Sequence, residues 1–212
     1  GGVDRFGGGW SFGWGCGVIG AFPVDILPDT TLMRRAGKND EGAFAELYRR
    51  YNRRLLDFFH ALGRDGHLAE ELASDTFARV WHVRQKYSAT GSFPAYLFSF
   101  ARHIWLEHCR RARKQWRLGT ITDWADVENT LVCLDALRPD ESAANAELEG
   151  RILGALDELP EEQRMVFVMR IVQRMSLEDI AAVMQCPVNT VRSRKLLALK
   201  RLREALRELL AV

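Results

Sequence analysis

Four hydrogen-bonding side chains near the C-terminus have the spacing that a DNA-reading helix needs. Thr190, Arg192, Ser193 and Arg194 follow Pro187, which ends one helical stretch and suits the start of another. In a helix-turn-helix, the first turns of the second helix enter the major groove of DNA. Arginine can donate two hydrogen bonds to guanine there, and serine or threonine can bind a phosphate or a base edge. These residues predict base recognition by the helix that follows Pro187.

Cations continue this surface toward the C-terminus. They stand at Lys195, Lys200, Arg201, Arg203 and Arg207. An ordinary helical hairpin with a solvated charged face would also carry such residues, so the helix pattern alone leaves that alternative open. A row of phosphate contacts would instead make binding strong and steeply dependent on salt. The length of the row favours DNA binding.

The preceding stretch supplies the other half of a helix-turn-helix. Ser176 can cap the start of a helix, and Asp179, three residues later, can return the interaction in a capping box. Ile180 and Val183 would face inward, and Val191 would hold the following helix to the same core. The two helices would then form one motif.

Helical periodicity organises the rest of the chain, and no stretch alternates for long enough to predict a strand. Apolar residues recur at steps of three and four through 31–60, 68–81, 95–114 and 147–172. Residues 115–146 lose this periodicity and are acidic, which predicts a linker. The predicted fold is all-α, with two small helical domains at 31–114 and 147–212 joined by the acidic linker and a helix-turn-helix in the second domain.

Residues 1–30 carry no helical periodicity and no signal-peptide pattern, and more than half of the 17 glycines lie within the first 20 positions. A glycine-rich nucleotide loop is one interpretation, but such a loop needs a strand before it and a helix after it. The sequence indicates neither. We therefore predict a disordered or non-native extension.

Charge and cysteine usage narrow the class of protein. The net charge is only +2, but an arginine-rich block at 102–117 precedes an acidic block at 123–149, so one part of the chain suits a polyanion. No apolar run is long enough to span a membrane. The four cysteines stand singly, and His103, His108 and Cys109 lack a fourth metal ligand. We expect a reduced, cytoplasmic protein without metal, cofactor, small-molecule substrate or catalytic constellation.

The C-terminal domain resembles the fourth-region domain of bacterial sigma factors of the extracytoplasmic-function class, sigma E-like, over residues 159–194, LPEEQRMVFVMRIVQRMSLEDIAAVMQCPVNTVRSR. The resemblance implies recognition of the −35 promoter element and contact with the β flap of RNA polymerase. The implied −35 residues are Thr190, Arg192, Ser193, Arg194, Leu196 and Leu197. The family generally has an apolar residue at Lys195 and often polar or basic residues at the leucines. Leu196 or Leu197 could instead touch thymine methyl groups or a protein partner.

The N-terminal domain resembles the second-region domain of the same class over 43–87, AFAELYRRYNRRLLDFFHALGRDGHLAEELASDTFARVWHVRQKY, and 91–114, GSFPAYLFSFARHIWLEHCRRARK. The resemblance implies docking on the β′ clamp helices of core RNA polymerase. The residues predicted for this contact are Leu72, Asp75, Phe77 and Trp81. The three apolar members could equally be core residues.

The loop SATGS, at 88–92, lies between aromatic residues and suits an unpaired base. Exposed rings there could stack on bases at about 1–3 kcal/mol each, and the loop hydroxyls could read a base edge. The helix beyond turns basic, which suits phosphate contacts. The predicted −10 binding and melting residues are Tyr87, Ser88, Thr90, Ser92, Phe93, Tyr96, Arg102, His103, Glu107, Arg110, Arg111, Arg113 and Lys114. The family commonly has Asn at His103 and Asp at Glu107.

Together the two resemblances predict a transcription initiation factor that binds core RNA polymerase and promoter DNA, with an anti-sigma factor as a further partner. By resemblance the linker threads channels of the polymerase; a solvated spacer is the alternative. The alternative function is a helix-turn-helix regulator of the response-regulator type with a helical sensing or partner-binding N-terminal domain. A receiver domain of that type needs a phosphoacceptor aspartate after a buried strand, and residues 31–114 indicate no strand.

Overall fold

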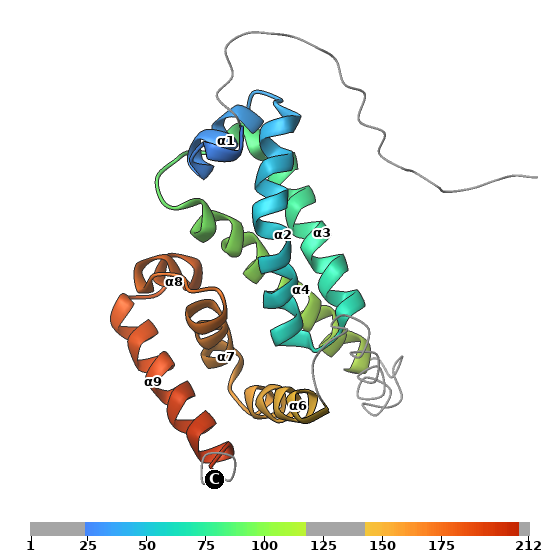
Figure 1. Ribbon diagram of the computed structural model, residues 1–212, viewed down its shortest axis with the longest axis vertical. Coiled ribbons are helices and arrows are strands. Elements are labelled where there is room, and N and C mark those ends of the chain that lie inside the picture. The colour runs from blue at the N-terminus through green and yellow to red at the C-terminus, as the bar shows by residue number, and fades with distance from the viewer. Residues whose placement is uncertain (1–23, 118–142, 208–212) are drawn as a thin grey trace, which may run out of the picture.

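Helices make up all the regular structure in the residues that the computed structural model describes, 24–117 and 143–207 (Figure 1). The prediction of an all-α fold is confirmed. No helix in these ranges is both long and apolar enough to cross a membrane.

The first group of helices forms around a long central helix, α2. Its elements are η1 (Val24–Ile26), α1 (Asp29–Ala36), α2 (Glu41–Gly63), α3 (Gly66–His82), η2 (Arg84–Lys86) and α4 (Phe93–Arg117). Asp40 caps α2 by accepting a hydrogen bond from the Ala43 amide at 3.0 Å, and Asp65 caps α3 in the same way through Leu68 at 3.1 Å. Arg64 ends α2 in a left-handed conformation.

Aromatic side chains fill the space between α2 and α4. Phe58 and Phe98 are fully buried, and their ring centroids lie 5.2 Å apart in an edge-to-face arrangement. Phe59 packs beside Phe58 at 5.3 Å. This core fixes α4, and therefore the loop that precedes it, against α2.

Helical structure is present before residue 31, where the first domain was predicted to start. α1 begins at Asp29, and the preceding segment is held to α2 by Arg50. The Arg50 guanidinium donates to the carbonyl of Leu27 at 2.9 Å and to the Asp29 carboxylate at 2.7 Å. Tyr51 donates a further hydrogen bond to Asp29. These hydrogen bonds give no apolar periodicity in the sequence, so the predicted domain start at residue 31 did not include this segment.

Glu46 on α2 makes the fold sensitive to acid. Hydrogen bonds from Arg49 and then Arg50, opposed by burial, lower the pKa of Glu46 to about 2 from its ordinary 4.5. The folded pKa is the lower one, so this contribution to stability is present above pH 4.5 and is lost as pH falls toward 2.

We expect Glu46→Gln to lower the free energy of unfolding at neutral pH, and the difference from wild type to shrink as pH falls through this window. Urea unfolding at several pH values measures both effects. Glu158→Gln, at an exposed acid of the other domain, is the control and should leave the profile unchanged. A constant Glu46→Gln deficit across the window would contradict the ionic origin.

The second group of helices contains the helix-turn-helix. Its elements are α6 (Ala143–Asp157), α7 (Glu161–Phe167), the π-helical turn η5 (Val168–Val172), α8 (Leu177–Met184) and α9 (Val188–Ala205). The Ser176 hydroxyl accepts the Asp179 amide at 2.9 Å, so the predicted N-cap is confirmed. Gln185 stops α8 in a left-handed conformation, and Val191 is fully buried, as expected.

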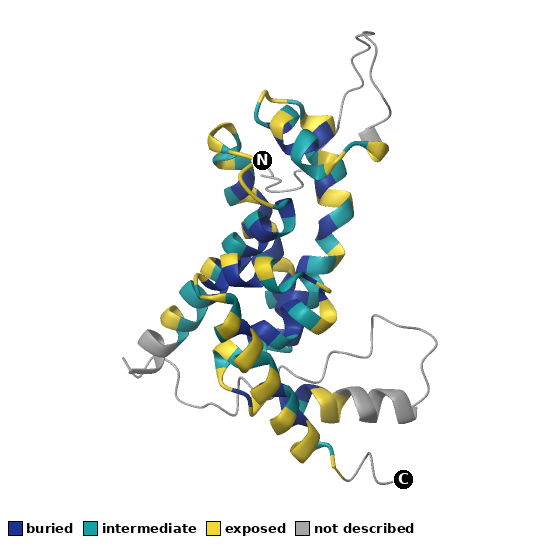
Figure 2. Ribbon diagram, turned by 90° about the vertical axis from the view of Figure 1, so that its left-hand side faces the viewer, coloured by how far each residue is buried: buried dark blue, intermediate teal, exposed yellow. Residues whose placement is uncertain are grey.

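The two groups of helices pack against each other. α8 contacts α4 (Figure 1), and η5 contacts α2. Buried residues of α8 such as Ile180 belong to the same continuous core as Phe93 and Leu97 of α4. Figure 2 shows the buried residues gathered in the interior and the exposed ones on the outer faces. α6 and α9 share a smaller core around Leu156 and Leu202.

The predicted acidic linker, 115–146, lies mostly outside the described residues. At its edges α4 continues to Arg117 and α6 already begins at Ala143. The predicted extension at 1–30 likewise lies outside them up to residue 23.

Candidate nucleic-acid interface

The two faces of α9 differ sharply in exposure. Val191, Ala198 and Leu202 are buried and recur at helical spacing. Arg192 and Ser193 lie on the opposite, exposed side, and Thr190 is half-buried beside them. The buried face therefore fixes the helix so that its first two turns point into solvent, where a DNA groove could receive them.

Leu196 and Leu197 also lie on the exposed face of α9. The exposed fraction is 63% for Leu196 and 48% for Leu197. Leu196 lies one turn beyond Arg192, and Lys200 lies one turn beyond Leu196. The predicted −35 residues of this helix thus share a surface in which the two leucines lie between cations.

Arg192 and Arg194, predicted as equivalent readers, have different environments. Arg194 lies between α9 and α7, where it pairs with Glu162 and donates to the Cys186 sulfur at 3.5 Å. Its side chain is only 23% exposed. Arg192 is exposed and donates to Asn189 of its own helix at 3.3 Å. Arg192 is therefore the better placed of the two for base contact, whereas Arg194 braces the helix.

The loop before α4 brings together the aromatic residues predicted for the −10 element. Tyr87 and Tyr96 are half-buried with ring centroids 4.9 Å apart, and Phe100, which the sequence did not single out, extends the row at 5.1 Å from Tyr96. Burial raises the pKa of both tyrosines. Their hydroxyls therefore stay protonated at neutral pH, and the rings offer neutral stacking surfaces.

Phe93 does not belong to this exposed set. It is 1% exposed and packs against Tyr51 of α2 at 5.1 Å. The prediction of an exposed stacking ring at Phe93 is therefore wrong for this arrangement, because the first turn of α4 points it into the core. Ser88 and Thr90 are exposed, as a base-contacting loop requires.

Ser92 makes contacts in both groups of helices. Its hydroxyl oxygen accepts the Ala95 amide at 3.2 Å and so caps α4. The same hydroxyl donates to the carboxylate of Asp179 on α8 at 2.5 Å. Asp179 was predicted to complete a local capping box, but its carboxylate also bonds across the domain interface.

Only some of the basic residues in the second half of α4 are exposed for contact with DNA. His103, Arg110 and Arg111 are exposed, and Arg102 is half-buried. The structure describes the helical backbone of Arg113 and Lys114, and their side chains lie outside the described part. For the basic residues of α4, phosphate binding remains a prediction.

Glu107 is held by cations of its own domain. Its carboxylate lies 2.6 Å from Arg79 of α3 and 3.7 Å from Arg111. The hydrogen bond from Arg79 is the main reason that its pKa is lowered. Glu107 therefore joins α3 to α4. Its carboxylate, which was predicted to contact the −10 element, is already bound by Arg79.

The predicted polymerase-binding residues on α3 divide into buried and exposed members. Leu72 and Phe77 are each 4% exposed and are core residues, so their prediction as direct contacts is corrected. Trp81 is half-buried, with Arg84 over its ring at 3.8 Å. Asp75 is exposed. Tyr48 of α2, which sequence reasoning missed, is 44% exposed and covers Phe77.

Two family models match the chain, and they match the two groups of helices. The model described as Sigma-70 region 2 matches residues 47–115, and the one described as Sigma-70, region 4 matches residues 149–202. The ECF RNA polymerase sigma factor SigX of Bacillus subtilis is 30% identical over 175 residues, 79% of this chain and 87% of SigX. The chain belongs to the ECF sigma factors.

A second sigma factor agrees with this assignment, and two solved structures share the fold. The RNA polymerase sigma-H factor of Pseudomonas aeruginosa is 28% identical over 86% of this chain and 95% of its own length. The solved structure of CnrH in complex with the cytosolic domain of CnrY shares the fold, with a TM-score of 0.62, 23% identity and coverage of 85% and 97% of the two chains. The sigma factor RpoE in complex with the anti-sigma factor NepR from Bartonella quintana gives a TM-score of 0.59, at 24% identity, and covers 77% and 96%.

Membership decides between the two predicted functions. A sigma factor binds core RNA polymerase and directs it to promoters for transcription initiation. The region 2 match covers the domain that a response regulator would use for sensing, so the regulator alternative is not supported.

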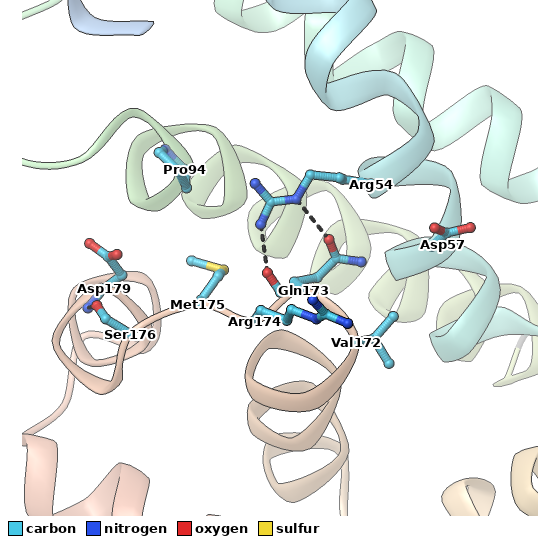
Figure 3. A pocket seen from close by; sticks show the side chains of 9 residues that line it. All are labelled: Arg54, Asp57, Pro94, Val172, Gln173, Arg174, Met175, Ser176 and Asp179. Carbon is cyan, nitrogen blue, oxygen red and sulfur yellow. Dashed lines mark hydrogen bonds between the residues drawn. The ribbon is translucent and has the colours of Figure 1, made fainter. Parts of the chain in front are cut away.

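The residues that join the two domains of this sigma factor had no signal in the sequence. Arg54 of α2 donates to the carbonyl of Gln173 at 2.7 Å and to its side-chain oxygen at 3.2 Å (Figure 3). Trp105 donates to Glu161 at 3.0 Å, and Arg64 pairs with Asp157 at 2.8 Å. Such partners, up to 119 positions apart, follow from the packing of whole domains.

A cavity of about 460 Å³ lies at this junction. Figure 3 shows its lining residues, which include Arg54 and Asp57 of α2 and, from the other domain, Gln173, Arg174 and Met175. The cavity is lined by groups of both charges and forms only while the domains are packed together.

His103, His108 and Cys109 do not come together as metal ligands. Among the described residues, no three His, Cys, Asp or Glu side chains form a group that could hold a metal ion. His108 instead stacks against Trp105, and burial lowers its pKa.

Proposed function

We propose that this sigma factor reads the −35 element with the exposed face of α9 and the −10 element with the 88–92 loop, its flanking tyrosines and the basic half of α4. The observation that carries the proposal is the division of α9 into a buried face and an exposed face that holds Arg192, Ser193 and both leucines. Only a helix fixed in this way can present defined donors to base edges.

We propose region 2 and region 4 domains at 31–114 and 147–212, with the residues from 24 onward supporting the first. The exposed acids of α3, Asp75 among them, and the ring of Tyr48 form the proposed polymerase-docking surface. Exposed acidic and aromatic groups suit a basic, partly apolar partner surface. The protein would act without catalytic chemistry of its own, in the cytoplasm, where RNA polymerase works.

The packed arrangement is the state in which promoter binding is blocked. The −10 and −35 elements lie about 25 base pairs apart by their names, which is about 85 Å at about 3.4 Å per base pair. α4 and α8 are in contact, and Ser92 of the −10 loop is bound to Asp179. The domains must therefore separate when core polymerase binds. Two solved structures of this fold are complexes, one with CnrY and one with the anti-sigma factor NepR, and we propose that a partner of this kind stabilises the packed state here.

Transcription with core polymerase on a promoter library tests the proposal. We expect promoter-dependent transcripts above core polymerase alone. Arg192→Ala should lower transcription from −35-dependent promoters by about 5- to 150-fold, the range for losing a bidentate base contact of about 1–3 kcal/mol.

Arg192→Lys is the matched control, because it keeps the charge and loses the bidentate geometry. If Arg192 contacts a base, transcription from −35-dependent promoters by the lysine variant should remain impaired. If the lysine variant is fully active, Arg192 contacts a phosphate and not a base. If the wild-type protein gives no promoter-dependent transcripts, the proposed function is wrong.

A further inference from the structure

Two neighbouring leucines form an apolar surface in the centre of the proposed DNA-binding face. Leu196 is 63% exposed and Leu197 is 48% exposed. A single exposed leucine is ordinary on a protein surface. Two in sequence, on the face of α9 that also holds Arg192 and Ser193, form an exposed apolar patch that suits a binding partner.

The charges around the leucines indicate what the occupant is. Arg192 lies one turn before Leu196, and Lys200 and Arg201 lie one turn beyond the pair and are exposed. Cations on both sides of an apolar patch match a polyanion that carries an apolar group between its charges. The major groove of DNA has phosphates along both edges and, on its floor, the methyl group of thymine.

Leucine also discriminates against the other bases. Its side chain neither donates nor accepts hydrogen bonds, so it would cover the polar edge of guanine, adenine or cytosine without replacing the water bound there. The thymine methyl group is the one large apolar feature of the major groove in unmodified DNA. We infer that Leu196 and Leu197 read thymine methyl groups, so that this sigma factor requires thymine at the −35 positions beneath them.

This inference rests on the proposed −35 role of α9 and adds a base preference to it. Burying one methyl group against leucine should improve promoter recognition by about fourfold per contact. This effect on transcription is smaller than the effect expected for Arg192→Ala. The two contacts can therefore be separated by the size of the loss and by the promoter position at which it occurs.

The test uses holoenzyme reconstituted from the full chain and core polymerase. Selection from promoters randomised across the −35 element should enrich thymine at one or two positions. Replacing each selected thymine with uracil removes only the methyl group, and we expect about a fourfold loss of transcription per position. Replacing the selected T·A pair with a C·G pair that carries 5-methylcytosine should recover part of the loss that unmodified cytosine causes.

The variants Leu196→Ala and Leu197→Ala assign the contact to the leucines. Each should lower transcription from the thymine promoter and should no longer distinguish thymine from uracil at the position that the replaced leucine contacts. Ile152→Ala, at an exposed apolar residue of α6, is the control and should keep the wild-type discrimination.

The outcomes separate the two proposals. If Arg192→Ala lowers transcription but uracil substitution costs wild type nothing, the −35 role stands and the methyl contact is overturned. If the leucine variants weaken transcription from thymine and uracil promoters equally and also weaken core binding, the patch contacts protein and the inference is wrong. If Arg192→Ala has no effect and selection finds no −35 preference, the proposed function itself fails.

Discussion

Replacing Asp179 with alanine should loosen the packing of the two domains and increase promoter binding by the free protein. The Asp179 carboxylate accepts the Ser92 hydroxyl at 2.5 Å, and this bond holds the −10 loop against α8. A hydrogen bond to a charged group contributes about 1.5–3 kcal/mol, so the packing equilibrium should shift by roughly 10- to 150-fold toward the open state. The helix cap survives, because it uses the Asp179 backbone amide.

Two measurements follow this change directly. Hydrogen exchange should become faster at the start of α4 and in α8, and a single-stranded −10 oligonucleotide should bind the free variant more tightly than wild type. Glu178→Ala is the matched control, since it removes an exposed acid from the same first turn of α8. If the two variants behave alike, the effect arises from helix charge and the Ser92 contact does not hold the domains.

The junction contains several further contacts, so Asp179→Ala should shift the equilibrium without abolishing packing. Arg54 binds Gln173, Trp105 binds Glu161, and the continuous apolar core runs beneath them. Core polymerase must replace these interactions when it separates the domains. A double variant, Asp179→Ala with Arg54→Ala, should open further than either single change, and its departure from additivity measures the coupling between the two contacts.

Local pattern predicted much of this fold, because helix signals lie within a few residues. Ser176 caps α8 and Val191 enters the core as the spacing indicated. The family resemblance then supplied the order of domains. The sequence pattern did not predict the direction in which side chains at the ends of helices point. Phe93 lies in the core, where Tyr51 of α2, more than 40 positions away in the sequence, packs against it.

Charge partners were harder to predict for the same reason. Arg192 and Arg194 look alike in sequence, and only the return of α7 toward α9 pairs Arg194 with Glu162. Glu107 has its partner Arg79 on another helix. A surface that is chosen by residue type alone therefore includes residues whose hydrogen bonds are already used inside the domain.

Tyr87→Ala should impair promoter melting strongly while Tyr87→Phe leaves it near wild type. The Tyr87 ring lies 4.9 Å from Tyr96, beside the loop proposed to receive an unpaired base. Stacking on such a ring contributes about 1–3 kcal/mol per base, so removing it should reduce open complexes by about 5- to 150-fold. The buried Tyr87 hydroxyl has no hydrogen-bond partner within the described residues, so its loss removes no bond that the structure shows. Permanganate reactivity of unpaired thymines measures the open complexes.

A template with a mismatched −10 region separates stacking from misfolding. Flipping a base out of duplex DNA costs a few kcal/mol, and a mismatch removes much of that cost before the protein binds. If Tyr87 acts by holding the unpaired base, Tyr87→Ala should regain much of its activity on the mismatched template. A variant that lost activity because the half-buried ring supports Tyr96 and α4 would stay inactive on both templates and would unfold at a lower temperature. Rescue on the mismatched template together with an unchanged melting temperature therefore assigns the ring to the melting step.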